Sequence, residues 1–398
     1  MTADLPALEG GTPVRRGAPV PFFRAPITED DIQAVVETLR SGWLTLGPRV
    51  GEFEAACATR LATPHAIATS SCTASLFLAL RAFGVKSGDE VIVPSLTFAS
   101  SVNTILHAGG EPVLGDIETK SFGLDPEAIE RLIGPRTRGI VAVDYAGHPC
   151  RIHELRALAR ARGLFLLEDA AHAFGATVDG QPVGNLADAT AFSFYATKCI
   201  TTGEGGLVTC ADDDLAQRVR LLGYHGMQRD AWKRYTERGS WYYEVELPGY
   251  KCNMTDVQAA LGLSQLRREL ELRAARAAVA ARYAAAFAGE AGLELPSVRP
   301  GVEHAWHLYV VRLRLERLAI DRDRFAQALR DEGVVPSVHF IPYHRHPVGR
   351  ALALRSPLAR TDDFADRCLS LPLFPHMPAA DLDDVVTAMR KLLHHYAR

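Results

Sequence analysis

Short apolar runs recur along the chain from His65 onward, with segments of helical spacing between several of them. The runs are almost continuously apolar, as expected of strands that are buried on both faces. Predicted strands cover residues 65–70, 90–95, 111–117, 139–145, 164–169, 191–195 and 206–210. The alternation with helices predicts an α/β fold with a mostly parallel sheet of seven strands. Since the last two runs are too close for a helical crossover, we expect them to pair antiparallel.

Segments with helical spacing accompany these runs. Covering helices are predicted at 73–83, 125–133 and 152–163. Another helix is predicted over 27–42. Thr28 and Asp31 form a capping signal at its start, and Gly42 is suited to end it. Residues 1–27 are rich in Pro and Gly, and we expect them to lie as an arm over the surface.

The last third of the chain is organised differently. Residues 255–288 predict one long helix, or two, after an N-cap at Thr255. Beyond them, strands are predicted at 306–313 and 335–340, and amphipathic helices at 321–333 and 381–396. These elements indicate a smaller α+β unit. We therefore predict a large domain over 1–260, including the arm, and a small C-terminal domain over 261–398.

Composition narrows the class of protein. The 398 residues with 47% hydrophobic content suffice for two domains. The net charge of -3 gives no general attraction to nucleic acid or to an anionic membrane. No apolar run reaches the roughly 18–20 residues of a membrane span, and the N-terminus lacks the pattern of a secretory signal. The seven cysteines are scattered without a CxxC pair, which favours reduced thiols in a cytoplasmic protein.

Lys198 is the main candidate for chemistry. It follows the strand predicted at 191–195, in a polar turn that continues into a glycine-rich segment. Ser193 and Thr197 place small hydroxyls beside it. A lysine that is desolvated among such neighbours can act as a nucleophilic amine. We interpret Lys198 as a lysine that carries pyridoxal phosphate as a Schiff base. The alternative is a solvated surface charge, the usual state of a lysine.

Asp169 and His172 follow a neighbouring strand. Asp169 closes the strand predicted at 164–169. Its carboxylate could pair with the protonated pyridine nitrogen of the cofactor, so that the ring acts as an electron sink. The alternative is a cap or turn residue. His172 could reach the cofactor or orient Asp169, although a lone histidine is commonly structural.

The first two strands supply further candidates. The segment SCTAS follows the first strand and opens a helix, and backbone N–H groups at such a place bind phosphate. The candidate phosphate contacts are Cys72, Thr73, Ala74 and Ser193. Phe98 follows the second strand and could stack on a planar ring, although a phenylalanine taken alone is more commonly a core residue.

Two other kinds of site are disfavoured. His339, His344 and His346 lie close in sequence, but their spacing matches no helical pair and no carboxylate is placed with them. A metal site is therefore not predicted. No GxGxxG segment follows the first strand, which argues against a nicotinamide enzyme.

The motifs together resemble the sugar-nucleotide aminotransferases of the DegT/StrS class, within the fold-type I pyridoxal phosphate enzymes. The resemblance spans residues 41–377, nearly the whole chain. In the family's order the motifs are SCTAS (71–75), GDEVIVPSLTFASSVN (88–103), VDYAGHPC (143–150), EDAAHA (168–173), FSFYATKCITTGEGG (192–206), PGYKCNMTD (248–256) and SVHFIPYHRHP (337–347).

The resemblance implies a role for each candidate. Lys198 carries the cofactor and moves a proton between cofactor and substrate, and Asp169 holds the pyridinium. His172 lies near the phenolic side of the ring, and Phe98 stacks on its face. Asn253 matches an asparagine that reaches the phosphate of the neighbouring subunit, which implies a homodimer with a shared active site. The implied phosphate contacts are the backbone of residues 72–74, the hydroxyl of Thr73, and Ser193.

The resemblance also implies a reaction. The chain is similar to members that aminate the 4-keto group of a nucleotide-linked 6-deoxyhexose or pentose, and SCTAS resembles members that use a thymidine-linked sugar. The implied amino donor is L-glutamate. Candidate substrate contacts are Lys251, Trp306, His307, Tyr343 and His344. The sequence departs from the common family pattern at Cys72, Tyr195 and Cys252.

Three alternatives stay open at the level of sequence. One is a 3-keto-sugar aminotransferase. A second is a dehydratase of the same class, although such members carry His at this place and the retained Lys198 argues against it. The third is a non-catalytic regulator, which would be expected to lose Lys198 or Asp169 or to gain a DNA-binding appendage.

Overall fold

The computed structural model describes residues 5–227 and 243–398. Its larger sheet has seven strands in the order β1-β9-β8-β5-β4-β2-β3. β9 is antiparallel to both of its neighbours, and the other adjacent pairs are parallel. The prediction of a mostly parallel sheet with an antiparallel last pair is therefore confirmed. The strands are β1 (His65–Thr69), β2 (Glu90–Pro94), β3 (Glu111–Gly115), β4 (Thr137–Val143), β5 (Phe165–Asp169), β8 (Ala189–Ser193) and β9 (Gly206–Cys210).

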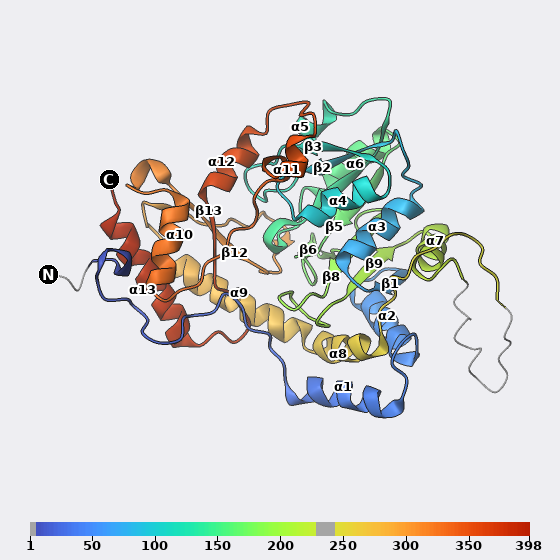
Figure 1. Cartoon of the computed structure of the whole chain (residues 1–398), viewed down its shortest axis with the longest axis horizontal. Coiled ribbons are helices and arrows are strands. Elements are labelled where there is room, and N and C mark those ends of the chain that lie inside the picture. Colours follow the sequence, from blue (N-terminus) through green and yellow to red (C-terminus); the bar gives the residue numbers. More distant parts are fainter. Residues whose placement is uncertain (1–4, 228–242) are drawn as a thin grey trace.

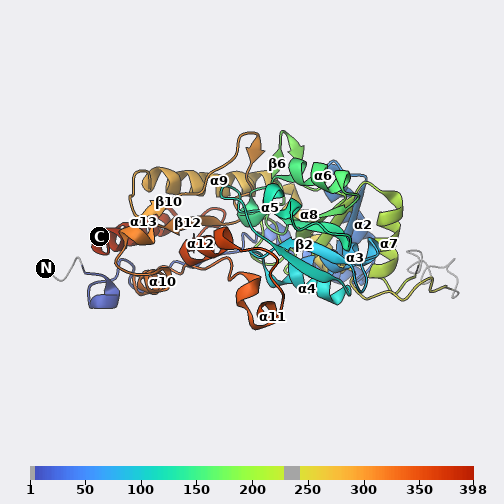
Figure 2. The same ribbon diagram turned by 90° about the horizontal axis from the view of Figure 1, so that it is seen from above.

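Helices cover both faces of this sheet (Figures 1 and 2). Alternate residues of β2 illustrate why: Val91 and Val93 belong to the core cluster that includes residues of α3, α4 and α7, whereas Ile92 belongs to the cluster with residues of α5 and α6. The three predicted covering helices are confirmed as α3, α5 and α6. The helices are α2 (Pro48–Arg60), α3 (Cys72–Ala82), α4 (Ala99–His107), α5 (Pro126–Glu130), α6 (Ile152–Ala161) and α7 (Asp213–Gly223).

Capping signals at two further helices are also confirmed. α1 (Glu29–Ser41) begins with a capping box between Thr28 and Asp31, and it ends at Gly42 in the left-handed conformation with φ of 78°. Thr255 caps α8 (Asp256–Arg267). α9 (Glu269–Ala286) follows after a break at Arg268. In Figure 1, α8 and α9 form a ridge that runs from the seven-stranded sheet to the C-terminal elements.

The C-terminal elements surround a three-stranded antiparallel sheet, in the order β10-β12-β13. Its strands are β10 (Leu293–Glu294), β12 (Tyr309–Leu313) and β13 (Cys368–Leu371), and the nearby helices are α10 (Arg322–Asp331), α12 (Ala359–Arg367) and α13 (Ala379–His395). The short α11 (Pro347–Arg350) lies beside the large sheet instead (Figure 1). A second small sheet joins β11 (Val302–Glu303), β6 (Thr177–Val178) and β7 (Gln181–Pro182). The predicted domain boundary near residue 260 falls within α8 and stays a prediction.

The strand predicted at 335–340 is wrong. Isolated bridges join Val334 to Val20 and Ser337 to Ser370, and β13 takes the place beside β12. Pro336 explains the interruption, because proline has no N–H to donate to a strand ladder.

The N-terminal arm is held more firmly than a surface arm. Val20 is fully buried in the core of the C-terminal elements, and its backbone bonds to Gly333 and Val335. Arg15 forms ion pairs with Asp381 at 2.7 Å and Asp384 at 2.8 Å. The arm then runs on to α1 (Figure 1). Within the described parts of the chain, no helix combines the length and apolar character of a membrane span.

Candidate active site

Lys198 lies in the turn after β8, as the sequence predicts. Its N–H donates to the carbonyl of Tyr195 at 2.9 Å, and the N–H of Thr202 returns to the carbonyl of Phe194 at 2.9 Å. The side chain is half-buried. Burial lowers the pKa of Lys198 below the usual value, and Cys72 and Asp169 oppose this shift without cancelling it. The amine is therefore easier to obtain in its neutral, nucleophilic form.

Asp169 ends β5 with a buried carboxylate that already has donors. Ser101 donates its hydroxyl to Oδ2 at 2.6 Å, and the N–H of Ala171 donates to Oδ1 at 3.1 Å. The thiol of Cys72 lies 3.9 Å from Oδ1. Burial raises the pKa of Asp169, and the bonds from Ser101 and Ala171 oppose that rise. Ser101 was missed in the sequence, although its place in the first turn of the helix after β2 points to the same edge of the sheet.

His172 is held as a neutral ring beside the amine. Its Nδ1 accepts a hydrogen bond from the N–H of Ala146 at 3.2 Å, which assigns the ring proton to Nε2. Burial lowers the pKa of His172 well below its usual value, and Lys198 and His339 lower it further. The ring lies 4.4 Å from that of His307, centroid to centroid. His172 can therefore offer one N–H donor at neutral pH.

The start of α3 provides backbone donors. Ser71 is the N-cap, and its hydroxyl accepts from the N–H of Ala74 at 3.1 Å. This bond occupies one of the three N–H groups predicted to bind phosphate. The N–H groups of Cys72 and Thr73 lie in the first turn, where a helix has no intrahelical acceptor for them. A helix start of this kind favours an anion.

Gly206 brings β9 against this helix start. A Cβ at this position would lie 2.4 Å from the carbonyl carbon of Ser71 and 2.6 Å from the backbone nitrogen of Cys72. Only glycine allows this approach. Gly206 pairs with Ser193 across the sheet, so the hydroxyl of Ser193 belongs to the same end of the sheet. The hydroxyl also accepts from the N–H of Tyr195 at 3.3 Å.

Phe98 is not a core residue. Its side chain is 61% exposed at the position just before α4, and its ring lies 5.9 Å from that of Phe340. An exposed aromatic ring at the end of a buried strand is available for stacking on a planar group.

The five predicted substrate contacts do not all meet at Lys198. His307 lies beside His172, but Trp306 stacks on His304 at 4.1 Å. Tyr343 is 1% exposed and donates its hydroxyl to Asn103 at 2.7 Å. The ring of His344 hydrogen-bonds to the side chain of Ser95 at 2.8 Å and to that of Asp362 at 3.1 Å. These two partners come from separate parts of the fold. Tyr343 and His344 thus pack the C-terminal elements against the large sheet.

Lys251 and Asn253 lie on the segment that leads into α8. Lys251 donates to the side-chain oxygen of Asn253 and stands 4.6 Å over the ring of Tyr224. The amide of Asn253 donates to the hydroxyl of Thr45 at 3.2 Å and to the carbonyl of Met254 at 3.0 Å. Within one chain, the two side chains thus bond each other and a residue between α1 and α2. The shared active site stays a prediction.

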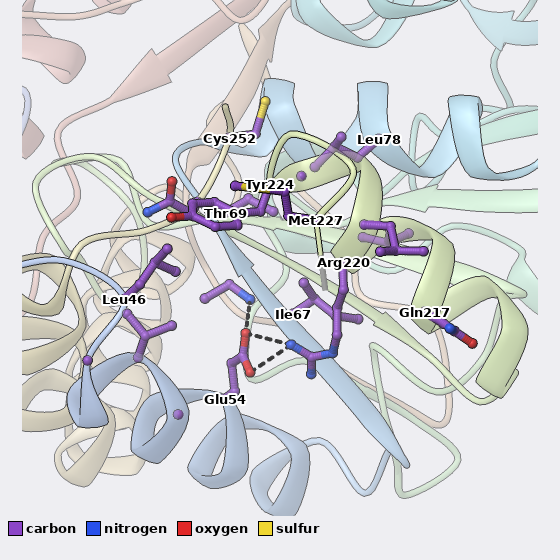
Figure 3. A pocket seen from close by; sticks show the side chains of 18 of the residues that line it. Leu46, Glu54, Ile67, Thr69, Leu78, Gln217, Arg220, Tyr224, Met227 and Cys252 are labelled. Carbon is purple, nitrogen blue, oxygen red and sulfur yellow. Dashed lines mark hydrogen bonds and ion pairs between the residues drawn. The ribbon is translucent and has the colours of Figure 1, made fainter. Parts of the chain in front are cut away.

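A hollow of about 830 Å³ opens near this segment, between α2, β1 and α7 (Figure 3). Asn253 and Thr69 are among its lining residues, whereas Lys198 and Asp169 are not. On one wall Arg220 pairs with the carboxylate of Glu54 at 3.0 Å. The hollow is therefore separate from the chemistry at the strand ends.

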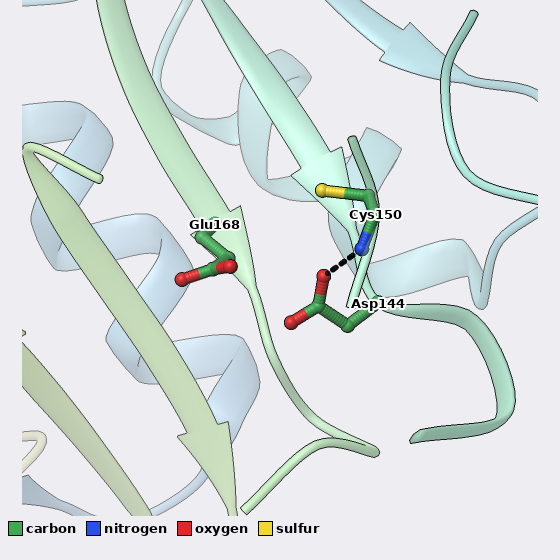
Figure 4. Close-up of side chains that lie close together, drawn as sticks. All are labelled: Asp144, Cys150 and Glu168. Carbon is green, nitrogen blue, oxygen red and sulfur yellow. Dashed lines mark hydrogen bonds between the residues drawn. The ribbon is translucent and has the colours of Figure 1, made fainter. Parts of the chain in front are cut away.

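A second acidic group lies buried where β4 and β5 end (Figure 4). Asp144, Cys150 and Glu168 come close enough to share a metal ion. Burial raises the pKa of Asp144 to about 7 and that of Glu168 well above its usual value, and the two carboxyl groups contact each other. Burial also raises the pKa of the Cys150 thiol well above its usual value. With pKa values raised in this way, the two carboxyl groups can share one proton.

Sequence reasoning also missed Arg276 on α9. Its side chain is fully buried, and its guanidinium donates to the carbonyl of Lys198 at 3.3 Å. The signal was present, because Arg276 shares the buried face of α9 with Leu272, Val279 and Tyr283. An arginine in an apolar stripe is unusual enough to be marked.

The described residues fit pyridoxal phosphate. Ser193, the N–H groups of Cys72 and Thr73, and the space that only glycine leaves at Gly206 would hold the phosphate. The buried carboxylate of Asp169 would face the ring nitrogen, and the exposed ring of Phe98 would cover the face.

Comparisons with known proteins agree with this fit. The sequence profile of the DegT/DnrJ/EryC1/StrS aminotransferase family matches residues 26–390. The spore coat polysaccharide biosynthesis protein SpsC of Bacillus subtilis is 46% identical over 377 residues, covering 94% of this chain and 97% of SpsC.

Two solved structures have the same fold. Helicobacter pylori PseC, an aminotransferase involved in the biosynthesis of pseudoaminic acid, gives a TM-score of 0.89 at 28% identity, covering 95% of this chain and 100% of PseC. Spr1654 of Streptococcus pneumoniae, assigned as a sugar aminotransferase and solved in its PLP form, gives a TM-score of 0.87 at 32% identity. That match covers 95% of this chain and 99% of Spr1654. The similarity therefore extends over nearly the whole chain.

Proposed function

This chain belongs to the DegT/DnrJ/EryC1/StrS aminotransferase family, and on that premise we propose that it aminates a nucleotide-linked 4-keto-6-deoxyhexose. The protein is a pyridoxal-phosphate-dependent sugar aminotransferase with the fold of the fold-type I enzymes. The proposed substrate is dTDP-linked, and the proposed amino donor is L-glutamate. The motifs SCTAS, PGYKCNMTD and SVHFIP support this choice, because they resemble members with that specificity.

The observation that carries the proposal is the meeting of a desolvated amine and a buried carboxylate. Lys198 and Asp169 come from the ends of neighbouring strands, and each shifts the pKa of the other. Perturbed groups of opposite charge in one site are typical of catalysis.

Each residue then has a distinct task. Bound pyridoxal phosphate supplies a carbonyl that takes up the amino group and a ring that takes up electrons. The Nζ of Lys198 takes the proton from the amine-bearing carbon of the donor and later returns a proton to the former keto carbon of the sugar. The carboxylate of Asp169 favours a protonated ring nitrogen. The Nε2–H of His172 is proposed to donate toward the phenolic oxygen.

Replacement of the amine tests the proposal directly. Purified wild-type protein should be yellow, and glutamate should bleach the visible band. In Lys198→Ala we expect transamination to fall at least roughly 10³-fold, because the proton-moving base is lost. Lys86→Ala is the control, because Lys86 is an exposed residue in the loop before β2 and is far from Lys198 in the sequence. Full turnover in Lys198→Ala would refute the assignment of this residue.

A substrate panel tests the finer claim. Thymidine- and uridine-linked sugars with the keto group at C3 or at C4 would each be assayed with glutamate. We expect the highest kcat/KM for the dTDP-linked 4-keto sugar. A preference for the 3-keto compounds would establish the alternative, a 3-keto-sugar aminotransferase, and leave the role of Lys198 intact.

We also propose a homodimer with shared active sites, supported by the match of Asn253 to the family's asparagine. Lys198→Ala and Asn253→Ala would be mixed after unfolding and refolding. If each site takes its lysine from one chain and its asparagine from the other, a hybrid dimer keeps one complete site of two. Because about half of the randomly formed dimers are hybrids, about a quarter of wild-type activity returns. If each chain supplies its own asparagine, mixing restores nothing beyond the sum of the two variants.

A further inference from the structure

Arg276 carries a positive charge that no acidic group in the described part of the chain neutralises directly. Its side chain is fully buried, and none of the described carboxylates forms an ion pair with it. Its partners are backbone oxygens. The guanidinium donates to the carbonyls of Lys198 at 3.3 Å, His307 at 3.4 Å and Leu373 at 3.4 Å. Burying an unpaired charge is costly, so its retention calls for a reason beyond packing.

The three carbonyls belong to different parts of the fold. Lys198 is in the turn after β8, His307 precedes β12, and Leu373 follows β13. Arg276 itself projects from α9, the helix that runs between these parts (Figure 1). One planar guanidinium, with donors in a fixed fork, therefore connects the lysine turn to the segments beside β12 and β13.

The other groups around the amine provide little positive charge. The rings of His172, His307 and His339 have pKa values held below the usual range by burial. Burial keeps the thiols of Cys72 and Cys199 protonated. Asp169 is the facing carboxylate, and it favours a charged amine. Among the groups that shift the pKa of Lys198, Arg276 carries a permanent positive charge, and this charge lowers that pKa.

We propose that Arg276 is a positioning residue of the transamination: it fixes the turn of Lys198 through the carbonyls, and its unpaired charge acts together with burial to disfavour protonation of the Lys198 nitrogen. The inference depends on the proposed role of Lys198 and is independent of which sugar is the substrate. A neutral amine is needed both to bind an aldehyde and to accept a proton.

The test is a pH titration of the visible absorption band of the holoenzyme in the absence of substrate, in which the titrating group is the Lys198 nitrogen joined to the cofactor. Arg276→Gln keeps an N–H donor and removes the charge, whereas Arg276→Lys keeps the charge. We expect the midpoint to rise by about one pH unit in Arg276→Gln, because a nearby positive charge no longer opposes protonation. In Arg276→Lys it should stay within about 0.3 unit of wild type.

Arg273→Gln is the matched control. Arg273 lies on the same helix, but it is partly exposed and pairs with Glu303 at 2.6 Å. Its replacement should leave the midpoint unchanged. Thermal unfolding of each variant separates loss of packing from loss of charge.

Two outcomes would overturn the proposal. One is an unchanged midpoint in a folded, yellow Arg276→Gln protein. The other is an equal shift in Arg276→Gln and Arg276→Lys, which would mean that shape and not charge matters. If Arg276→Gln does not fold, Arg276→Met takes its place, because it fills much of the same space without a charge: a midpoint raised by about one unit supports the proposal, and an unchanged midpoint refutes it. Loss of the band in Lys198→Ala tests the proposed function separately.

Discussion

The floor of the site and its C-terminal wall use different chemistry. The floor consists of Asp169, Ser101, Ser193 and Gly206, which lie at or near the ends of strands in the seven-stranded sheet. The wall consists of His307, His339 and Phe340, which come from loops of the C-terminal elements. The floor presents a carboxylate, hydroxyls and backbone N–H groups, whereas the wall presents neutral aromatic rings.

The floor and the wall also differ in how many of their polar groups have a hydrogen-bond partner. On the floor, Asp169 has two donors in place. On the wall, His307 has a buried Nδ1 without a hydrogen-bond partner among the described residues. Burial lowers the pKa of His339 to about 4, so this ring is neutral at pH 7. We therefore expect the floor to hold the charged cofactor and the wall to contact neutral groups of the sugar.

The largest effect should follow from removing the charge of the floor. Asp169→Asn keeps the shape but can no longer favour a protonated ring nitrogen. We expect kcat/KM to fall roughly 10²–10³-fold for every substrate, as measured by single-turnover assays. Asp188→Asn is the control, because Asp188 accepts the N–H of Leu166 at the opposite end of the same strands. A loss confined to one substrate would show that Asp169 belongs functionally to the wall.

Much of this floor was predictable from the sequence. The apolar runs gave the strands, and the ends of parallel strands meet at one edge of a sheet, so Lys198, Asp169 and Ser193 had to come together. The same logic explains why Ser101 was missed. Its role depends on the direction of one helical turn toward Asp169, which the pattern of apolar residues does not specify.

The next effect in size should come from the glycine that lets β9 approach α3. In Gly206→Ala the new Cβ would overlap the backbone of Ser71, so the start of the helix must shift. Overpacking of this kind costs about 1–3 kcal/mol, and we expect cofactor affinity to fall roughly 10- to 100-fold. Fluorescence titration of the apoenzyme with pyridoxal phosphate measures this affinity.

Gly134→Ala is the matched control for this variant. A Cβ at Gly134 would meet no atom within 4 Å. Cofactor affinity should therefore be unchanged. If both variants bind the cofactor equally well, the start of α3 is not the phosphate site.

The wall was less accessible to sequence reasoning. Its rings come together only after the C-terminal elements fold against the large sheet, through contacts far apart in the chain such as Tyr343 with Asn103. A motif match indicated Tyr343 and His344 as candidate substrate contacts, which stays a prediction, and the match does not contain their side-chain bonds to Asn103, Ser95 and Asp362. The strand predicted at 335–340 shows the same limit, because Pro336 and the bridge to Val20 depend on partners that the local pattern does not contain.

A smaller effect is expected from the hydroxyl that donates to the floor carboxylate. Ser101→Ala removes the 2.6 Å hydrogen bond that opposes the raised pKa of Asp169. The pKa of Asp169 should then rise, and because the ionised form is the useful one, the acidic limb of the pH–rate profile should move to higher pH. We expect a shift of about one unit and roughly tenfold lower activity on that limb. Ser100→Ala is the control. If the acidic limb does not move in Ser101→Ala, the ionisation of Asp169 does not determine that limb.

The smallest effect should appear on the wall and should depend on the substrate. The ring of Phe340 lies 5.8 Å from that of His172 and 5.9 Å from that of Phe98. Phe340→Leu keeps an apolar side chain but removes an aromatic contact, worth about 0.5–1.5 kcal/mol. We expect KM for the keto sugar to rise about threefold to tenfold, while the absorption band and the half-reaction with glutamate stay as in wild type. Phe325→Leu, in the core of the C-terminal elements, should lower the unfolding temperature without changing KM. If Phe340→Leu instead weakened cofactor binding and left KM unchanged, the wall would share the task of the floor, and the division between cofactor and substrate would fail.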